Sequence, residues 1–172
     1  MKKAFLITLI LSLGLIGAGC SDKENRSDQR NNQTQVSSVK KMTEDARLSA
    51  LATTIDNGRV LVSGTTNLPD KTELLISLTN EAIGFDAQDK SIVINGKFSA
   101  DPLGPMSGVV AGNYIIEIMM PVPSVQSDSV QSIVGNEGQY LSGPLVKDSS
   151  MGGKTVEYSF SYTVGSKESI RQ

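Results

Sequence analysis

The chain of 172 residues contains no histidine, no tryptophan and one cysteine. Without histidine there is no Ser-His-Asp triad, no Cys-His nucleophile pair and no histidine-ligated metal. A single cysteine excludes an internal disulfide and a zinc site built from thiolates. The formal net charge of −2 gives no excess of basic residues for general binding to nucleic acid. Carboxylates are therefore the strong acid–base groups that remain for catalysis.

The N-terminus has the pattern of a secretory signal. Lys2 and Lys3 precede residues 4–19, which carry no charge and are rich in Leu and Ile. A transmembrane helix needs about 20 residues, and this run is shorter. A charged start, an apolar centre and small residues at the end predict a signal peptide over residues 1–19.

The signal ends in Leu15-Ile16-Gly17-Ala18-Gly19-Cys20, which resembles the lipobox of bacterial lipoproteins. The resemblance implies that the Cys20 thiol receives a diacylglyceryl group, that cleavage occurs just before Cys20, and that the new amine is acylated. Two chains on the thiol and one on the amine would anchor the protein stably in a lipid bilayer, since one chain alone is marginal. Gly17 stands where the family usually has Leu, so ordinary secretion and an uncut anchor helix are the alternatives. In the family, Ser21 rather than Asp after the cysteine favours the outer membrane of a Gram-negative cell.

Residues 20–54 are expected to link this anchor to a folded domain. Residues 21–38 are polar and contain almost no apolar side chain, so burial cannot offset the entropy of ordering them. They predict a flexible tether. In residues 39–54, Thr43 as a cap with Glu44 and Asp45 in the first turn predicts a short helix, although its apolar residues form no clean stripe.

From residue 55 to residue 165 the apolar residues recur at every second position, which predicts a β-sandwich domain. Residues 154–164 are the clearest strand, with five apolar or aromatic residues on one face and mainly hydroxyl residues on the other. Asn95-Gly96 predicts a type I′ hairpin between residues 91–94 and 97–99. Further strands are expected at 59–65, 73–79, 83–87 and 114–120, a short helix at 125–134 before Gly135, and a polar tail at 166–172. The fold class is thus mainly β, with about seven strands and one or two short helices.

Two segments resemble the Ig-like and prealbumin-like (transthyretin-like) sandwich modules of secreted bacterial proteins. The first is Gly64-Thr65-Thr66-Asn67-Leu68-Pro69-Asp70-Lys71-Thr72-Glu73-Leu74, and the second runs from Asn95-Gly96-Lys97-Phe98 to Ala111-Gly112-Asn113-Tyr114. In those modules a Gly-x-Tyr before a strand places the tyrosine hydroxyl on nearby backbone, and Tyr114 matches this position. The resemblance covers residues 56–121 and lacks the cysteine pair and tryptophan of antibody domains. It implies a single sandwich that binds, spaces or holds out other domains, and fold alone does not choose among these roles.

The candidate sites for chemistry are weak. Asp86 and Asp89 form the densest acidic spot, close to a predicted loop, but they lack the Asp-x-Asp-x-Asp-Gly spacing of a Ca²⁺ loop and predict a solvated turn. Gly152-Gly153-Lys154-Thr155 lacks the full spacing of a phosphate-binding loop and precedes a strand, so it also predicts a turn. A glycosidase would need two carboxylates facing each other across a groove, which the sequence does not place.

Glu117 interrupts the apolar run of residues 114–120. Its face of the strand is therefore either partly exposed or holds a partner for the carboxylate. An exposed face with Ile115, Met119 and Met120 would form a patch for binding a partner. An edge strand or a half-covered strand is the simpler interpretation.

The sequence as a whole predicts a membrane-anchored lipoprotein of the bacterial cell envelope, attached through acylated Cys20. Its sandwich is expected to be a non-catalytic module that binds another envelope protein or has a structural role. The alternative is a periplasmic inhibitor or a lipoprotein that binds a small ligand, and a carbohydrate-active enzyme ranks last. No cofactor, metal or nucleic acid is expected as a partner.

Overall fold

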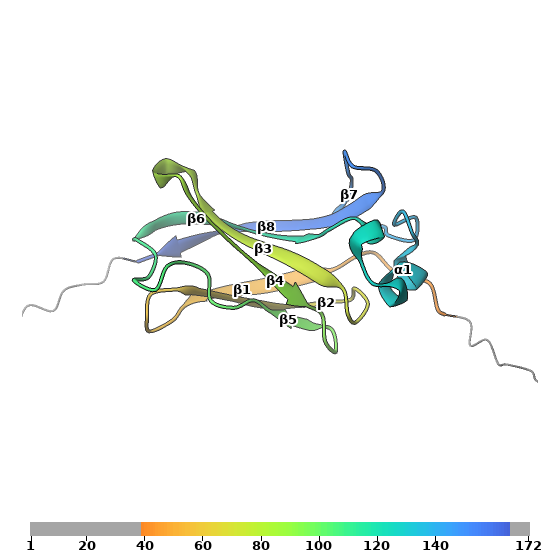
Figure 1. The fold of residues 1–172 in the computed structure, drawn as a ribbon, viewed down its shortest axis with the longest axis horizontal. Coiled ribbons are helices and arrows are strands. Elements are labelled where there is room, and N and C mark those ends of the chain that lie inside the picture. Colours follow the sequence, from red (N-terminus) through yellow and green to blue (C-terminus); the bar gives the residue numbers. More distant parts are fainter. Residues whose placement is uncertain (1–38, 166–172) are drawn as a thin grey trace, which may run out of the picture. The chain divides into compact units, whose positions relative to one another are not determined.

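The computed structural model describes residues 39–165, and within them eight strands form two sheets. The strands are β1 Leu48–Thr54, β2 Val60–Thr66, β3 Glu73–Asn80, β4 Phe85–Ile92, β5 Lys97–Ser99, β6 Gly112–Met120, β7 Val146–Asp148 and β8 Lys154–Val164. One sheet has the order β1-β2-β5 and the other the order β4-β3-β6-β8-β7, with all neighbours antiparallel. The two sheets face each other across one hydrophobic core (Figure 1), so the predicted mainly β sandwich is confirmed at this level.

The central strands of the larger sheet supply much of the core. Leu74, Ile76 and Leu78 of β3 are fully buried, and so are Ile116 and Ile118 of β6. Ile76 lies opposite Ile118, and Leu78 opposite Ile116, so the apolar faces of the two strands coincide. Because burial of each such side chain contributes about 1.5–3 kcal/mol, this alternation determines which face of the sheet turns inward.

The segment before residue 55 differs from the prediction. Residues 39–54 were expected to include a marginal helix, whereas Leu48–Thr54 is strand β1 and pairs with β2 along its whole length. The helix prediction was wrong because Leu48 and Ala52 are buried at alternating positions against the core, and this tertiary packing outweighs a local cap at Thr43. The sandwich therefore begins upstream of residue 55.

The β4–β5 connection forms the hairpin turn that the sequence predicts. Asn95 and Gly96 have φ values of 52° and 69°, and Ile94 and Lys97 exchange backbone hydrogen bonds of 2.9 and 3.0 Å. Strand β5 then pairs with β2 in the other sheet, so the turn is as predicted but the predicted pairing of residues 91–94 with 97–99 is limited to the Ile94–Lys97 bridge. Upstream, the strand expected at 83–87 is instead the short 3-10 helix η1 Glu81–Ile83 followed by the longer β4.

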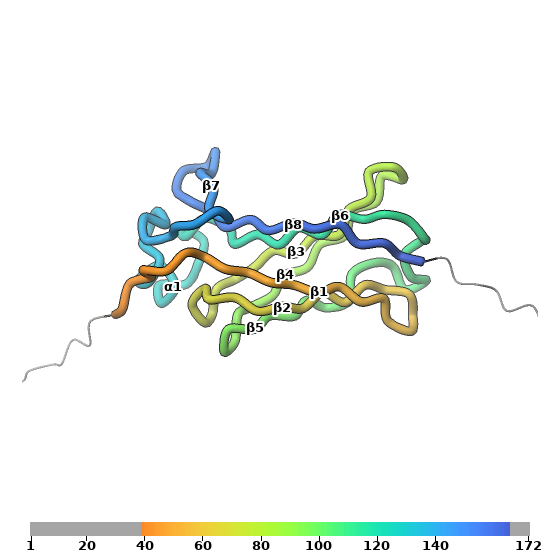
Figure 2. Tube along the Cα trace, turned by 180° about the vertical axis from the view of Figure 1, so that it is seen from behind, coloured from red at the N-terminus to blue at the C-terminus, as the bar shows by residue number. Residues whose placement is uncertain are grey.

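A helical segment closes one end of the sandwich. The short 3-10 helix η2 Pro123–Val125 leads into α1 Asp128–Val134, which ends before Gly135 as predicted. Residues 40–46 lie beside this segment and the loop that follows it, with the Met42 N–H donating to the Ile133 carbonyl of α1 at 3.0 Å and the Ala46 N–H to the Ser142 carbonyl of the loop at 2.8 Å. Both views show the chain entering beside α1 and leaving after β8 at the opposite end (Figures 1 and 2).

The described residues contain no helix that is long and apolar enough to cross a membrane. The predicted signal peptide, Cys20, Ser21, the tether over residues 21–38 and the tail over residues 166–172 lie outside the described residues.

Candidate functional site

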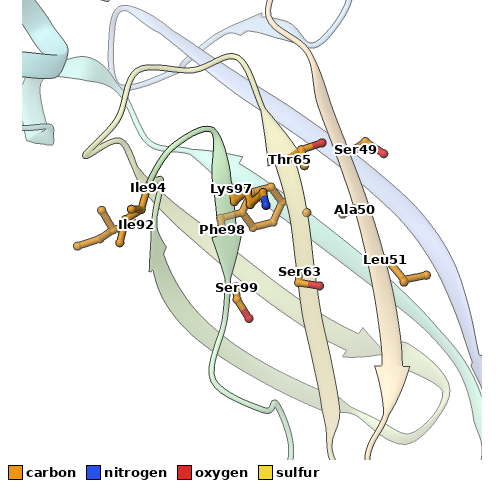
Figure 3. A pocket seen from close by; sticks show the side chains of 11 residues that line it. Ser49, Ala50, Leu51, Ser63, Thr65, Ile92, Ile94, Lys97, Phe98 and Ser99 are labelled. Carbon is orange, nitrogen blue, oxygen red and sulfur yellow. The ribbon is translucent and has the colours of Figure 1, made fainter.

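The outer face of the three-stranded sheet is hollowed because its side chains are small. The register places Ser49 beside Thr65 and Ser63 beside Ser99 on this face. A hollow of about 650 Å³ lies over these residues, and a second of about 840 Å³ adjoins it and shares Ser49 and Thr65. We call the two hollows together the outer trough. Its first hollow is drawn in Figure 3.

The rim of the outer trough carries large aliphatic side chains that face solvent. Leu51 is 68% exposed, Ile92 51% and Ile94 64%. Figure 3 shows Leu51 on β1, at the opposite side of the sheet from Ile92 and Ile94, which lie beyond β5. Lys97 adds a cation to the lining. Solvent-exposed aliphatics around a floor of hydroxyl groups provide apolar contact area, which suits the surface of another protein.

Phe98 and Gly64 support the floor of the trough from the core side of the sheet. Phe98 is buried, and its ring packs against Gly64 on the neighbouring strand. A Cβ atom at position 64 would overlap both the Phe98 ring and the carbonyl oxygen of Ser49. The close approach of β1, β2 and β5 therefore depends on glycine at this position.

The second hollow of the trough is bounded by polar contacts that fix the start of β1. The Arg47 N–H donates to Asn67 Oδ1 at 2.7 Å, and Asn67 Nδ2 donates to the Asp45 carbonyl at 2.8 Å. The Arg47 guanidinium pairs with Glu44 at 2.6 Å, with both side chains largely exposed. An exposed pair of this kind contributes little to stability, so the backbone contacts to Asn67 are what position this part of the rim.

The predicted acidic spot is dispersed. Asp86 and Asp89 lie on strand β4 rather than in a loop, and their odd spacing directs them to opposite faces of the strand. Asp89 Oδ2 accepts a hydrogen bond from the Asp101 backbone N–H at 2.6 Å. Within residues 39–165 no three acidic or cysteine side chains gather in a way that could hold a metal ion.

The strand face that carries Glu117 is partly exposed, which is one of the two alternatives that the sequence left open. Glu117 and Ile115 are exposed and Met119 is half-buried, but Met120 is fully buried on the opposite face of β6. The patch expected from these residues therefore lacks Met120. Ser77 and Ser159 flank Glu117 across the neighbouring strands, so this face is more polar than the rim of the trough.

The other residues that the sequence analysis selected have structural roles. The Tyr114 hydroxyl donates to the Val110 carbonyl at 2.9 Å, which is the backbone contact predicted for it. Gly152 and Gly153 have φ values of 87° and 75° and form the turn before β8, as predicted. The sequence did not identify the outer trough, because residues 48–54 were assigned to a helix and their outward face was not recognised.

Cys20, the predicted site of lipidation, lies outside the described residues. Comparisons with protein-family models, with curated proteins and with solved structures gave no match for this chain.

Proposed function

We propose that this chain is a lipid-anchored protein of the bacterial cell envelope whose sandwich binds another envelope protein without catalysing a reaction. The observation that carries the proposal is the outer trough, where Leu51, Ile92 and Ile94 are each at least half exposed. Aliphatic side chains in water favour a partner that covers them, since burial contributes roughly 25 cal/mol per Å². The anchor rests on the lipobox at Leu15-Ile16-Gly17-Ala18-Gly19-Cys20.

The order of the strands supports an Ig-like arrangement of the sandwich. Three strands, β1-β2-β5, face β4-β3-β6-β8, and Tyr114 makes its backbone contact at the start of β6. In Ig-like domains a tyrosine at the start of the corresponding strand hydrogen-bonds to backbone a few residues upstream. Modules of this class serve mainly as binding or spacing units, which agrees with a binding role for the trough.

A second candidate function is inhibition of a target by an inserted loop. Met106 is 80% exposed at the tip of the loop between β5 and β6. The loop is braced on both sides, by the Arg59 Nε donating to the Gly104 carbonyl at 3.0 Å and by the Val109 N–H donating to the Gly58 carbonyl at 2.9 Å. A rigid loop with a protruding side chain fits a cleft, so Met106 is the residue that this alternative requires.

The proposed function can be tested with the anchored chain in its own cells. Intact mass should show the added lipid on the wild type and its loss in Cys20→Ala, with the wild type in the membrane fraction. A photo-crosslinking residue at position 51 should give one adduct with an envelope protein. Ile94→Asp should lower that yield about tenfold, because it introduces a charge into the apolar contact.

The matched control is the same crosslinker at position 88, which is exposed on β4 in the other sheet. It should give no such adduct. Equal adducts from positions 51 and 88 would rule out the trough as the binding face, whereas an unacylated, soluble wild type would rule out the anchor. An adduct from position 106 alone would favour the inhibitor.

A further inference from the structure

The edges of the two sheets are unequally protected against pairing with another strand. Strand β4 at one edge carries Asp86, Asp89 and Lys90, and β5 and β7 are each only three residues long. Charges and short length are the usual means by which edge strands avoid pairing with other chains. The flank formed by β1 and β8 has neither protection, since β1 contains no charged residue and β8 extends well past β7.

Within residues 39–165, strand β8 has a strand neighbour on one side alone over most of its length. Strand β7 pairs with it only as far as Val156, and the Leu145 carbonyl accepts the Glu157 N–H at 2.9 Å. From Tyr158 to Val164, β8 pairs with β6 alone among the described residues. This segment reads Tyr-Ser-Phe-Ser-Tyr-Thr-Val and contains no charge, proline or glycine.

The free backbone groups of β8 can be assigned from the contact at Glu157. Its N–H points away from β6, so in an antiparallel ladder the N–H and C=O groups of every second residue point the same way. Ser159, Ser161 and Thr163 therefore present their backbone donors and acceptors to the open edge. Only another extended strand can pair with such a row.

Aromatic side chains lie along the same open flank. Tyr158, Phe160 and Tyr162 point toward the core but remain half-exposed, and the rings of Tyr158 and Phe160 are 5.8 Å apart. Strand β1 meets this stripe at one end, where Thr54 Oγ1 and the Tyr162 hydroxyl are hydrogen-bonded at 2.8 Å. Figure 2 shows β1 and β8 along this flank. The stripe therefore has apolar surface for the side chains of an added strand.

We propose that the occupant of this edge is β8 of a second copy of the chain, paired antiparallel about a two-fold axis at Ser161. Ser161 is the midpoint of the uncovered segment, and the two-fold axis makes the segment its own partner. The opposed residues would be Ser161 with Ser161, Phe160 with Tyr162, Ser159 with Thr163 and Tyr158 with Val164.

The composition of the segment supports this pairing. Aromatic residues lie opposite aromatic residues and hydroxyl residues opposite hydroxyl residues, and no two like charges meet. The groups of Ser159, Ser161 and Thr163 would form about six backbone hydrogen bonds between the copies. The two larger sheets would become one continuous sheet across the axis.

Disulfide trapping tests the pairing and its register in the full chain with Cys20→Ala. This background removes the one native thiol and the proposed anchor, so the result does not depend on the proposed function. Ser161→Cys should form a disulfide-linked dimer under mild oxidation, because opposed residues of a hydrogen-bonded pair have Cα atoms about 5.5 Å apart. Ser159→Cys is the matched control, since its two copies would have Cα atoms roughly 14 Å apart.

A charge at the axis provides a second measurement that does not need a disulfide. Ser161 is exposed, so Ser161→Lys should leave the thermal unfolding of the dilute monomer unchanged and weaken self-association at least about tenfold in sedimentation experiments. Gln88→Lys adds the same charge at the protected β4 edge and should have no effect. A monomeric chain at all concentrations, or equal trapping at positions 159 and 161, would overturn the proposal. Loss of a different bound protein in Ser161→Lys would assign the edge to another partner and would also overturn it.

Discussion

Tyr114 joins a loop to the core with one side chain. It is 1% exposed, its ring meets Phe85 edge-on at 5.7 Å, and its hydroxyl reaches the Val110 carbonyl. The hydroxyl therefore fixes the end of the loop that leads from β5 into β6, while the ring fills space between strands. The two contributions can be separated because phenylalanine keeps the ring and removes the hydroxyl.

Tyr114→Phe should lower the free energy of unfolding by about 1 kcal/mol, the usual net contribution of one hydrogen bond. The melting temperature should fall by roughly 3–6 °C. Tyr140→Phe is the control, because Tyr140 is 38% exposed and its hydroxyl has no partner among residues 39–165. Equal melting temperatures for the two variants would show that the Tyr114 contact contributes nothing to stability.

At the scale of elements, the helical segment packs on the core through Val130 and Val134, and one further side chain, Gln126, joins it to the backbone of β3. Gln126 lies just after η2, and its side-chain amide bonds both backbone groups of Glu73, at 2.8 and 3.1 Å. It is 5% exposed, and its own carbonyl accepts from Gln131 Nε2 at 2.8 Å. This pair of bonds closes the start of β3 on the side of β6, whose pairing with β3 begins only at Leu75, while β4 pairs with Glu73 on the other side.

Gln126→Ala should destabilise the domain by about 1–3 kcal/mol, because it leaves two backbone groups of Glu73 without their partner. Chemical denaturation measures this loss, and hydrogen exchange should speed up at the Glu73 amide. The control is Gln88→Ala at an exposed position on β4, which should change stability by less than about 0.5 kcal/mol. Unchanged exchange at Glu73 would contradict the role given to Gln126.

Elements with a strong local signal were predictable from the sequence. The strict alternation of residues 154–164 predicted β8 with the observed bounds, and Asn95-Gly96 predicted the turn because both residues adopt positive φ. The pairing of the strands on either side of this turn was not predicted correctly, because β4 and β5 join different sheets. Strand β1 was missed because Ala50 and Ala52 have low β propensity. In addition, Thr43, Glu44 and Asp45 have the pattern of a helix N-terminus. The outer trough was missed for a related reason, since its lining comes from strands that only the sheet register brings together.

At the scale of the whole domain, the smaller sheet depends on its first strand. Without β1, only β2 and the three-residue β5 would remain to cover the larger sheet. Leu48 and Ala52 would be lost from the core, and a two-stranded sheet of this size is marginal in water. Residues 39–54 are therefore part of the folding unit.

A fragment of residues 39–165 should unfold cooperatively on heating, and a fragment of residues 55–165 should not. Circular dichroism and the sharpness of the thermal transition measure the difference. The longer fragment serves as the control for removing residues 1–38. Cooperative unfolding of both fragments at the same temperature would place the domain boundary at residue 55 after all.

The position of the two chain ends determines how the domain would respond to tension. The chain enters beside α1 and leaves at the opposite end, and β1 and β8 lie in different sheets and point in the same direction (Figures 1 and 2). A pull between residues 39 and 165 would act along both strands, so β1 would have to slide past β2 and β8 past β6. Sliding strains all hydrogen bonds of a ladder together rather than one after another. The domain should therefore extend only at high force, which suits a link that stays folded while its two ends are pulled apart.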